Sequence, residues 1–159
     1  EQRLLPSNTD KEPLLGAIGW PEDDNAEEVA KQIQQSCDGA LDAQTCTYLA
    51  NTYGMRGYVV AQLVRTDPSA GKAIVSGRPE IFACVDWAVR EELAVSVEDV
   101  LMRRTQLYYR DPDQARSNAS DVGKRIAALL GWNDETRDTS VADYLNTVAQ
   151  SRRWSESGA

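Results

Sequence analysis

Histidine is absent from this chain, and phenylalanine occurs only once. Without histidine, a Ser or Cys catalytic triad lacks its usual general base, and a zinc site built from cysteine and histidine is nearly excluded. The three cysteines show no C-x-x-C spacing. We interpret Cys37, Cys46 and Cys84 as reduced, buried thiols of a cytosolic protein. These absences argue against an autonomous hydrolase and against a metal site.

Long apolar runs and an excess of basic residues are also lacking. The longest apolar stretch, residues 58–64, contains Gln62 and is far too short to span a bilayer. No signal peptide is visible. The net charge is -8, from 17 basic and 25 acidic residues, whereas a nucleic-acid binder presents a basic face. We therefore expect no transmembrane segment and no nucleic-acid partner.

Helical spacing of apolar residues dominates the chain, and no segment alternates with the period of a strand. The length of 159 residues favours one domain. The sequence predicts an all-α fold, a single compact domain of six to seven helices. An extended lead-in with proline and glycine breakers would occupy residues 1–24, the helical domain residues 25–151, and a fraying polar tail residues 152–159.

Helix starts and stops can be read from individual residues. The expected N-caps are Asn25, Asp42, Ser96, Asp111 and Asn133, and the expected stops are Gly39, Gly54 and Gly131. A third helix should cover residues 55–65 and bury Val59, Val60 and Leu63. Pro79 should lie in the first turn of a fourth helix, where its missing N–H costs nothing. A fifth helix should cover residues 97–109.

Residues 79–105 are the most informative part of the chain. Glu92 and Arg104 each fall on the apolar face of a predicted helix, where an unpaired charge is costly. If the two helices pack face to face, these residues form a buried ion pair that fixes the helix register. We favour this structural role over a catalytic carboxylate or a phosphate-binding arginine. Removal of one partner should then cost about 3–5 kcal/mol.

The same stretch carries a resemblance to a known family. The sequence R-x-E, followed by a capped helix ending in D-V-L-x-R-R-T, resembles the C-terminal domain of FAD-dependent glycerol-3-phosphate dehydrogenases and glycerophosphate oxidases. Two further segments fit the pattern, Tyr53-Gly54 and Leu14-Leu15-Gly16-Ala17. The resemblance covers roughly residues 12–150. Its core residues are Arg90, Glu92, Ser96, Asp99, Val100, Leu101, Arg103, Arg104 and Thr105.

The resemblance implies an accessory domain that packs on an upstream FAD and substrate domain of the same polypeptide. That parent would oxidise sn-glycerol 3-phosphate to dihydroxyacetone phosphate and pass electrons to membrane quinone or to oxygen. It would be cytoplasmic or peripheral at the inner face of the membrane. Flavin and substrate residues would precede Glu1, so the resemblance implies no catalytic or cofactor-binding residue here. The alternative is a stand-alone helical protein-interaction module.

Two sets of residues are candidates for surface contacts. Arg103 and Arg90, together with Arg110 and Arg56, could form a local basic surface. We favour the alternative for Arg103, an ordinary solvated face with an Asp99–Arg103 pair at i,i+4. None of Trp20, Trp132 and Trp154 sits clearly on a helix core stripe. These three tryptophans could instead form an apolar patch, and large exposed patches of this kind mark interaction sites.

Overall fold

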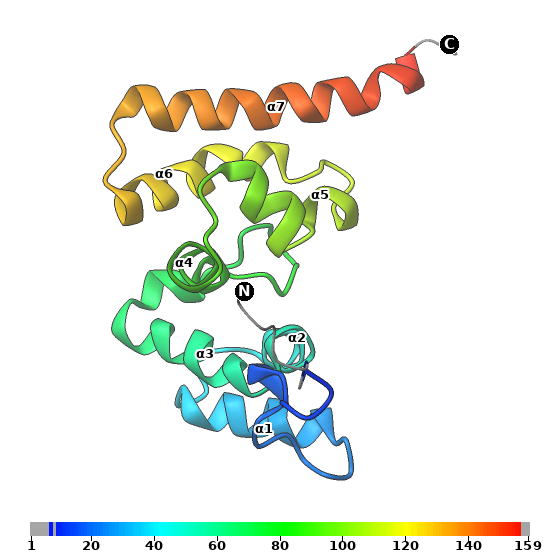
Figure 1. Cartoon of the computed structure of the whole chain (residues 1–159). Coiled ribbons are helices and arrows are strands. Elements are labelled where there is room, and N and C mark those ends of the chain that lie inside the picture. Colours follow the sequence, from blue (N-terminus) through cyan, green and yellow to red (C-terminus); the bar gives the residue numbers. More distant parts are fainter. Residues whose placement is uncertain (1–6, 8, 157–159) are drawn as a thin grey trace, which may run out of the picture. The chain divides into compact units, whose positions relative to one another are not determined.

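The computed structural model describes residue 7 and residues 9–156, apart from the side chains of residues 154–156. Every regular element in this range is a helix, and the one β pairing is an isolated bridge between Ala73 and Ile81. The predicted all-α class is therefore confirmed (Figure 1). Where the sequence predicts one compact domain, the chain divides into two compact units, Glu1–Arg65 and Thr66–Ala159. Residues 1–6 and 8 of the expected lead-in, and residues 157–159, lie outside the described part.

The N-terminal unit contains helices α1 (Ala26–Ser36), α2 (Ala43–Tyr53) and α3 (Gly57–Thr66). The two predicted caps are confirmed. Asn25 Oδ1 accepts a hydrogen bond from Glu28 N–H at 3.1 Å, and Asp42 Oδ1 accepts one from Thr45 N–H at 2.7 Å. The core of this unit consists mainly of apolar side chains from α1 and α2 and from the chain between them: Val29, Ile33, Cys37, Leu41, Cys46 and Leu49.

Helix α3 corrects one detail of the predicted burial. Val60 is fully buried as predicted, and Leu63 is half-buried. Val59 was expected inside but is 47% exposed. The buried face of α3 instead comprises Gly57, Val60, Ala61 and Val64, which recur at helical spacing. The helix begins only at Gly57, after a short 3-10 turn at Gly54–Arg56.

Two glycines bring the lead-in against the end of α2. Residues 15–17 form a short 3-10 turn that packs on the turn at Gly54–Arg56. Gly54 has φ 58° and ψ -137°, a combination that glycine tolerates and other residues avoid. A Cβ on Gly54 would lie 2.3 Å from the carbonyl oxygen of Gly16, and a Cβ on Gly16 would lie 2.9 Å from that of Tyr53. The lead-in can therefore cross here only while both positions lack a side chain.

The C-terminal unit contains α4 (Phe82–Glu91), a π-helix (Asp99–Arg104), α5 (Leu107–Arg110), α6 (Ala119–Leu130) and α7 (Asp134–Glu156). The prediction that Pro79 lies in the first turn of α4 is wrong. Ile81 is instead extended, and the chain on either side of it pairs with residues 72–74: Ile74 N–H donates to Glu80 O, and Phe82 N–H donates to Lys72 O. These bonds hold the chain away from a helix until Phe82.

The predicted continuous helix over residues 97–109 is also wrong. Ser96 does cap its start, since Ser96 Oγ accepts from Asp99 N–H at 3.0 Å and Asp99 Oδ2 accepts from Val95 N–H at 3.0 Å. The following turns widen into a π-helix, in which Thr105 N–H donates to Val100 O five residues earlier. Gln106 then adopts a left-handed conformation, with φ 59°, and separates the π-helix from α5.

The two last helices differ from the prediction at their outer ends. Asp111 does not start α6. It accepts from Ala115 N–H at 2.9 Å within a turn, and α6 begins at Ala119. Leu130, the last residue of α6, is exposed. The caps at Gly131 and Asn133 are confirmed. Helix α7 continues to Glu156, so the expectation that the chain frays from Arg152 is wrong for residues 152–156.

Helix α6 lies at the centre of the C-terminal unit and packs on both α4 and α7 (Figure 1). Gly123 allows a close approach of α6 and α7, because a Cβ there would lie 2.6 Å from Val141 Cγ2. Tyr144 of α7 is fully buried, and its hydroxyl donates to the carbonyl oxygen of Gln114. The core also includes Val85, Ala88, Val97, Val100, Leu101, Leu107, Val122, Ile126 and Val148.

Candidate functional site

The structure brings Glu92 and Arg104 together at the end of α4. Arg104 Nε lies 3.2 Å from Glu92 Oε2, and Arg104 Nη2 donates to the backbone carbonyl of Glu92 at 2.6 Å. Trp87 Nε1 donates to the second carboxylate oxygen, Oε1, at 3.0 Å. The guanidinium thus binds both the side chain and the backbone carbonyl of Glu92, the C-cap of α4, where a cation also complements the helix dipole. The pair joins the end of α4 to the π-helix.

The burial of this pair differs from the prediction. The prediction places Glu92 on the apolar face of a helix, but α4 stops at Glu91. The buried face of α4 therefore does not extend to Glu92. The side chains of Glu92 and Arg104 are 28% and 33% exposed. Solvent therefore screens their attraction, and neither charge is stranded in a dry interior when the other is removed. A cost of 3–5 kcal/mol is too large for a pair in this environment.

We expect Arg104→Ala to lower the free energy of unfolding of the C-terminal unit by about 1–2 kcal/mol, chiefly through the lost charged hydrogen bond to the Glu92 carbonyl. Arg103→Ala is the matched control, because Arg103 lies on the same turn, is itself 49% exposed, and binds the side chains of Glu98 and Asp99 rather than a backbone carbonyl. That change should cost less than about 1 kcal/mol. Urea unfolding of both variants measures the difference, and equal losses would contradict the capping role of Arg104.

Arg103 and Arg90 do not converge on a common partner. Arg103 Nη2 lies 2.6 Å from Glu98 Oε1, and Nη1 lies 2.8 Å from Asp99 Oδ1. The Asp99–Arg103 ion pair at i,i+4, which the sequence predicts, is therefore present. Arg90 is exposed on α4 and forms no salt bridge with another described residue. Arg110 faces Glu80, at 3.5 Å, so the structure groups none of these side chains around a single ligand.

The connection between α4 and the π-helix exposes apolar side chains. Leu93 adopts φ 59°, which is uncommon for a residue with a branched side chain, and it is 83% exposed. Val95 is exposed two residues later. The Asp99 carboxylate and the Ser96 hydroxyl fix this connection through the capping bonds described above. Desolvation raises the pKa of Asp99, but the Val95, Ser96 and Arg103 hydrogen bonds outweigh it and lower the pKa overall.

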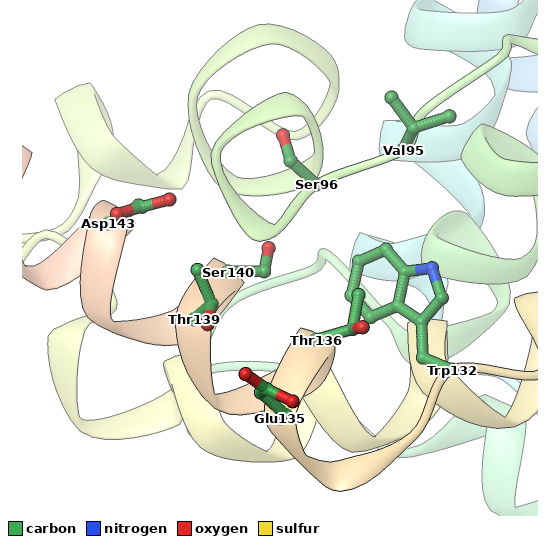
Figure 2. Close-up of a pocket in the computed structure, with 8 residues that line it drawn as sticks. All are labelled: Val95, Ser96, Trp132, Glu135, Thr136, Thr139, Ser140 and Asp143. Atoms are coloured by element: carbon green, nitrogen blue, oxygen red, sulfur yellow. The ribbon is translucent and has the colours of Figure 1, made fainter.

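A surface groove of about 410 Å³ lies beside this connection. Figure 2 shows Val95 and Trp132 at one end and Asp143 at the other, with the side chains of α7 between them. We call it the α7 groove. One wall is the connection at residues 95–96 and the other is the first part of α7. The full lining is Val95, Ser96, Trp132, Glu135, Thr136, Thr139, Ser140 and Asp143.

The chemistry of the α7 groove is acidic and hydroxylic. Neither Glu135 nor Asp143 forms a salt bridge with another described residue, and no lysine or arginine lines the groove. Ser140 Oγ accepts from Val97 N–H at 3.0 Å, which joins the two walls. The groove has neither a histidine nor a cysteine that could act as a nucleophile or base. Its lining suits the binding of a cationic and partly apolar group.

Among residues 7 and 9–156, no three His, Cys, Asp or Glu side chains are arranged to hold a metal ion. No helix in that part of the chain combines the length and the apolar character needed to cross a membrane. Cys37, Cys46 and Cys84 are buried, and none of them forms a disulfide. Burial raises the pKa of Cys46 to about 11, which disfavours the reactive thiolate.

Part of the site was visible in the sequence. Trp132 was singled out there as lying off the helix core stripes, and it lines the α7 groove. Trp20, in the N-terminal unit, instead donates to Asp24 at 2.6 Å. The side chain of Trp154 lies outside the described part. The hydroxyls and acids of α7 carried no signal of their own, because polar residues on a helix surface are ordinary.

The described part is an all-helical protein with an open surface groove beside α7. Comparison with known proteins makes this specific. Residues 7–137 match the family model of the C-terminal domain of alpha-glycerophosphate oxidase. The chain therefore belongs to this family, and the resemblance drawn from its residues is confirmed. The match includes residues of both compact units, so the family's domain extends over the two.

Individual relatives carry related names. A probable mitochondrial glycerol-3-phosphate dehydrogenase of Dictyostelium discoideum is 34% identical over 111 residues, which are 68% of this chain and 17% of that protein. Glycerol-3-phosphate dehydrogenase 2 of Mycobacterium tuberculosis is 29% identical over 92% of this chain and 24% of its own length. The mitochondrial glycerol-3-phosphate dehydrogenase SDP6 of Arabidopsis thaliana is 26% identical, over 94% and 26%. No solved structure matches. The chain thus spans about a quarter or less of these relatives.

Proposed function

We propose that this chain is the C-terminal accessory domain of an FAD-dependent glycerol-3-phosphate dehydrogenase. The parent would oxidise sn-glycerol 3-phosphate to dihydroxyacetone phosphate at a flavin and pass the electrons to membrane quinone or to oxygen. The observation that carries the proposal is the family match over residues 7–137. Relatives named as glycerol-3-phosphate dehydrogenases, each several times longer than the matched part, support it.

The residues of this chain do not fit a flavin site. A dinucleotide is held where a strand leads through a G-x-G-x-x-G turn into a helix. The sequence contains no such glycine pattern, and the helical elements of the described part provide no strand to precede one. The flavin and the substrate would therefore bind to the remainder of the polypeptide. The role of this chain would be to pack on that remainder and stabilise it.

Exposed apolar side chains on the lead-in support a packing role. Leu14, Leu15 and Ile18 are large, apolar and exposed around the first 3-10 turn. The Gly16–Gly54 crossing holds the backbone of this segment against α2, so the exposure is not that of a loose end. In the family resemblance, the flavin-binding portion ends at this segment. These side chains are therefore suited to contact that portion in the parent.

The test uses the complete polypeptide. Addition of glycerol 3-phosphate without oxygen should bleach the flavin absorbance and yield dihydroxyacetone phosphate. The variant Leu14→Ser/Leu15→Ser/Ile18→Ser should keep the helical content but release flavin several-fold faster, because apolar area buried against the flavin portion is lost. Val59→Ser is the control, since Val59 is an exposed apolar residue of the same unit. A flavin that stays oxidised with glycerol 3-phosphate would refute the proposed function.

The alternative, a stand-alone helical interaction module, predicts a different result. In that case no flavin would copurify with the complete polypeptide, and the lead-in variant would behave like the Val59 control. The family match favours the accessory domain. The parent is further proposed to be cytoplasmic, and peripheral at the inner membrane face if quinone is its acceptor. No helix in the described part could anchor it by crossing the bilayer.

A further inference from the structure

We propose that the α7 groove binds a basic segment from the remainder of the same polypeptide, with a lysine or arginine at the acidic side chains and an apolar side chain against Val95 and Trp132. This inference rests on the proposed function, because it requires the remainder to be attached. It adds a second contact surface, separate from the lead-in, and it states which side chains the partner must present.

The charge of the groove selects a cationic occupant. Glu135 and Asp143 line it without a salt bridge to any described residue. They lie eight residues apart on α7, or about 12 Å along the helix axis, so two cations could be accommodated at once. An anion such as glycerol 3-phosphate would be repelled. The N-terminus of α7 has one fewer free N–H group to donate to an anion, because Thr136 N–H already donates to Asn133 Oδ1 at 2.8 Å.

The apolar end of the groove selects a partner with a mixed character. Val95 is exposed and lies beside Trp132 (Figure 2). Leu93, two residues earlier, is 83% exposed and is held in a left-handed conformation that costs free energy. The turn lets Ala94 N–H donate to Ala88 O at 2.9 Å, but it leaves the Leu93 side chain in water. A partner that covers these apolar side chains would recover the cost by removing them from water.

The hydroxyls between the two ends suit a peptide chain. Thr136 and Thr139 are exposed on the face of α7 that carries Glu135 and Asp143. Their hydroxyl groups can donate to, or accept from, the backbone of a segment lying along the groove. The groove is open along its length rather than enclosed, and a surface of this kind fits a protein segment better than a small molecule.

The remainder of the polypeptide is the occupant that the comparisons favour. The matched relatives are about four to six times longer than the part that this chain covers. A segment on the same polypeptide reaches the groove at an effective concentration in the millimolar range. A contact with few charged and apolar groups, too weak to hold a free protein, is sufficient under those conditions. The net charge of -8 on this chain also favours a basic partner.

The experiment measures hydrogen exchange in the complete polypeptide. Peptides covering residues 93–98 and 134–143 should be protected in the wild type. The variant Glu135→Lys/Asp143→Lys should exchange about tenfold faster in these peptides, because it presents cations to a cationic partner. The control Asp134→Lys/Asp121→Lys has the same change in net charge. Asp134 and Asp121 are exposed and do not line the groove, and Asp134 also lies in the first turn of α7.

Three outcomes would overturn the inference. The groove peptides could exchange equally fast in the wild type and the double variant, or the control could have the same effect as the double variant. Protection that increases with protein concentration would assign the groove to a second copy of the chain. Unchanged exchange over residues 82–89 shows that the unit remains folded. Flavin reduction by glycerol 3-phosphate, measured on the same samples, reports on the proposed function separately.

Discussion

Gly54→Ala should destabilise the N-terminal unit by roughly 3–5 kcal/mol. The methyl group would lie 2.3 Å from the carbonyl oxygen of Gly16, a separation that no real Cβ contact adopts. The backbone at φ 58° and ψ -137° adds strain for any residue with a side chain. Because the obstacle is backbone rather than a flexible side chain, it can be relieved only by moving the lead-in away from α2.

The measurement is native-state hydrogen exchange of α2 amides, which reports opening of this unit without assuming that both units unfold together. Gly39→Ala is the matched control. Gly39 also has a positive φ, of 73°, but a Cβ there has no neighbour within 4 Å. Only backbone strain remains, about 1–2 kcal/mol. If Gly54→Ala cost no more than this control, the crossing of the two glycines would not contribute to stability.

This crossing explains two separate matches in the family resemblance. Leu14-Leu15-Gly16-Ala17 and Tyr53-Gly54 fit the family pattern as isolated segments, separated by 35 residues of the chain. No local pattern connects the two segments. A glycine at a helix end indicates a stop on local grounds, and that prediction for Gly54 was correct. The close approach of Gly16 to Gly54 is a tertiary contact, which rules based on local sequence do not predict.

Caps were predicted more accurately than helix lengths for a related reason. Asn25, Asp42, Ser96 and Asn133 act through hydrogen bonds within three residues, so local sequence determines them. The start of α4 instead depends on bonds between residues 72–74 and 80–82. The π-helix depends on packing around Val100 and Leu101, both fully buried. Where long-range packing sets the backbone, helical spacing alone extends a helix too far.

In the candidate site, too, features set by local sequence were predicted and features set by long-range packing were not. Helical spacing placed Glu92 and Arg104 on facing surfaces, and their side chains do meet. Their burial was overestimated because α4 ends one residue before Glu92. The α7 groove could not be predicted, since it forms where residues 95–96 approach a helix about forty residues later in the chain. Its polar lining has no periodicity that would separate it from an ordinary solvated face.

Arg125→Met should lower the free energy of unfolding of the C-terminal unit by about 3–5 kcal/mol. Arg125 on α6 binds Asp86 on α4 through two hydrogen bonds, Nε to Oδ1 at 2.6 Å and Nη2 to Oδ2 at 2.5 Å. It also lies 2.7 Å from Asp67. The Asp86 side chain is only 4% exposed, so the variant would leave its charge buried without a partner. The hydrogen bonds that Arg125 donates to Asp86, together with the Asp86 charge, raise the pKa of Arg125, which therefore stays charged.

Two comparisons separate this cost from simple loss of a surface charge. Lys124→Met changes the neighbouring residue, whose partner Asp121 is exposed, and should cost at most about 1 kcal/mol. The double variant Asp86→Leu/Arg125→Met removes both charges, and it should recover most of the loss because no buried charge remains. Urea unfolding followed by circular dichroism measures all three. A double variant no more stable than Arg125→Met would show that Asp86 is not the source of the penalty, and that Arg125 acts mainly through Asp67 and Ser69 instead.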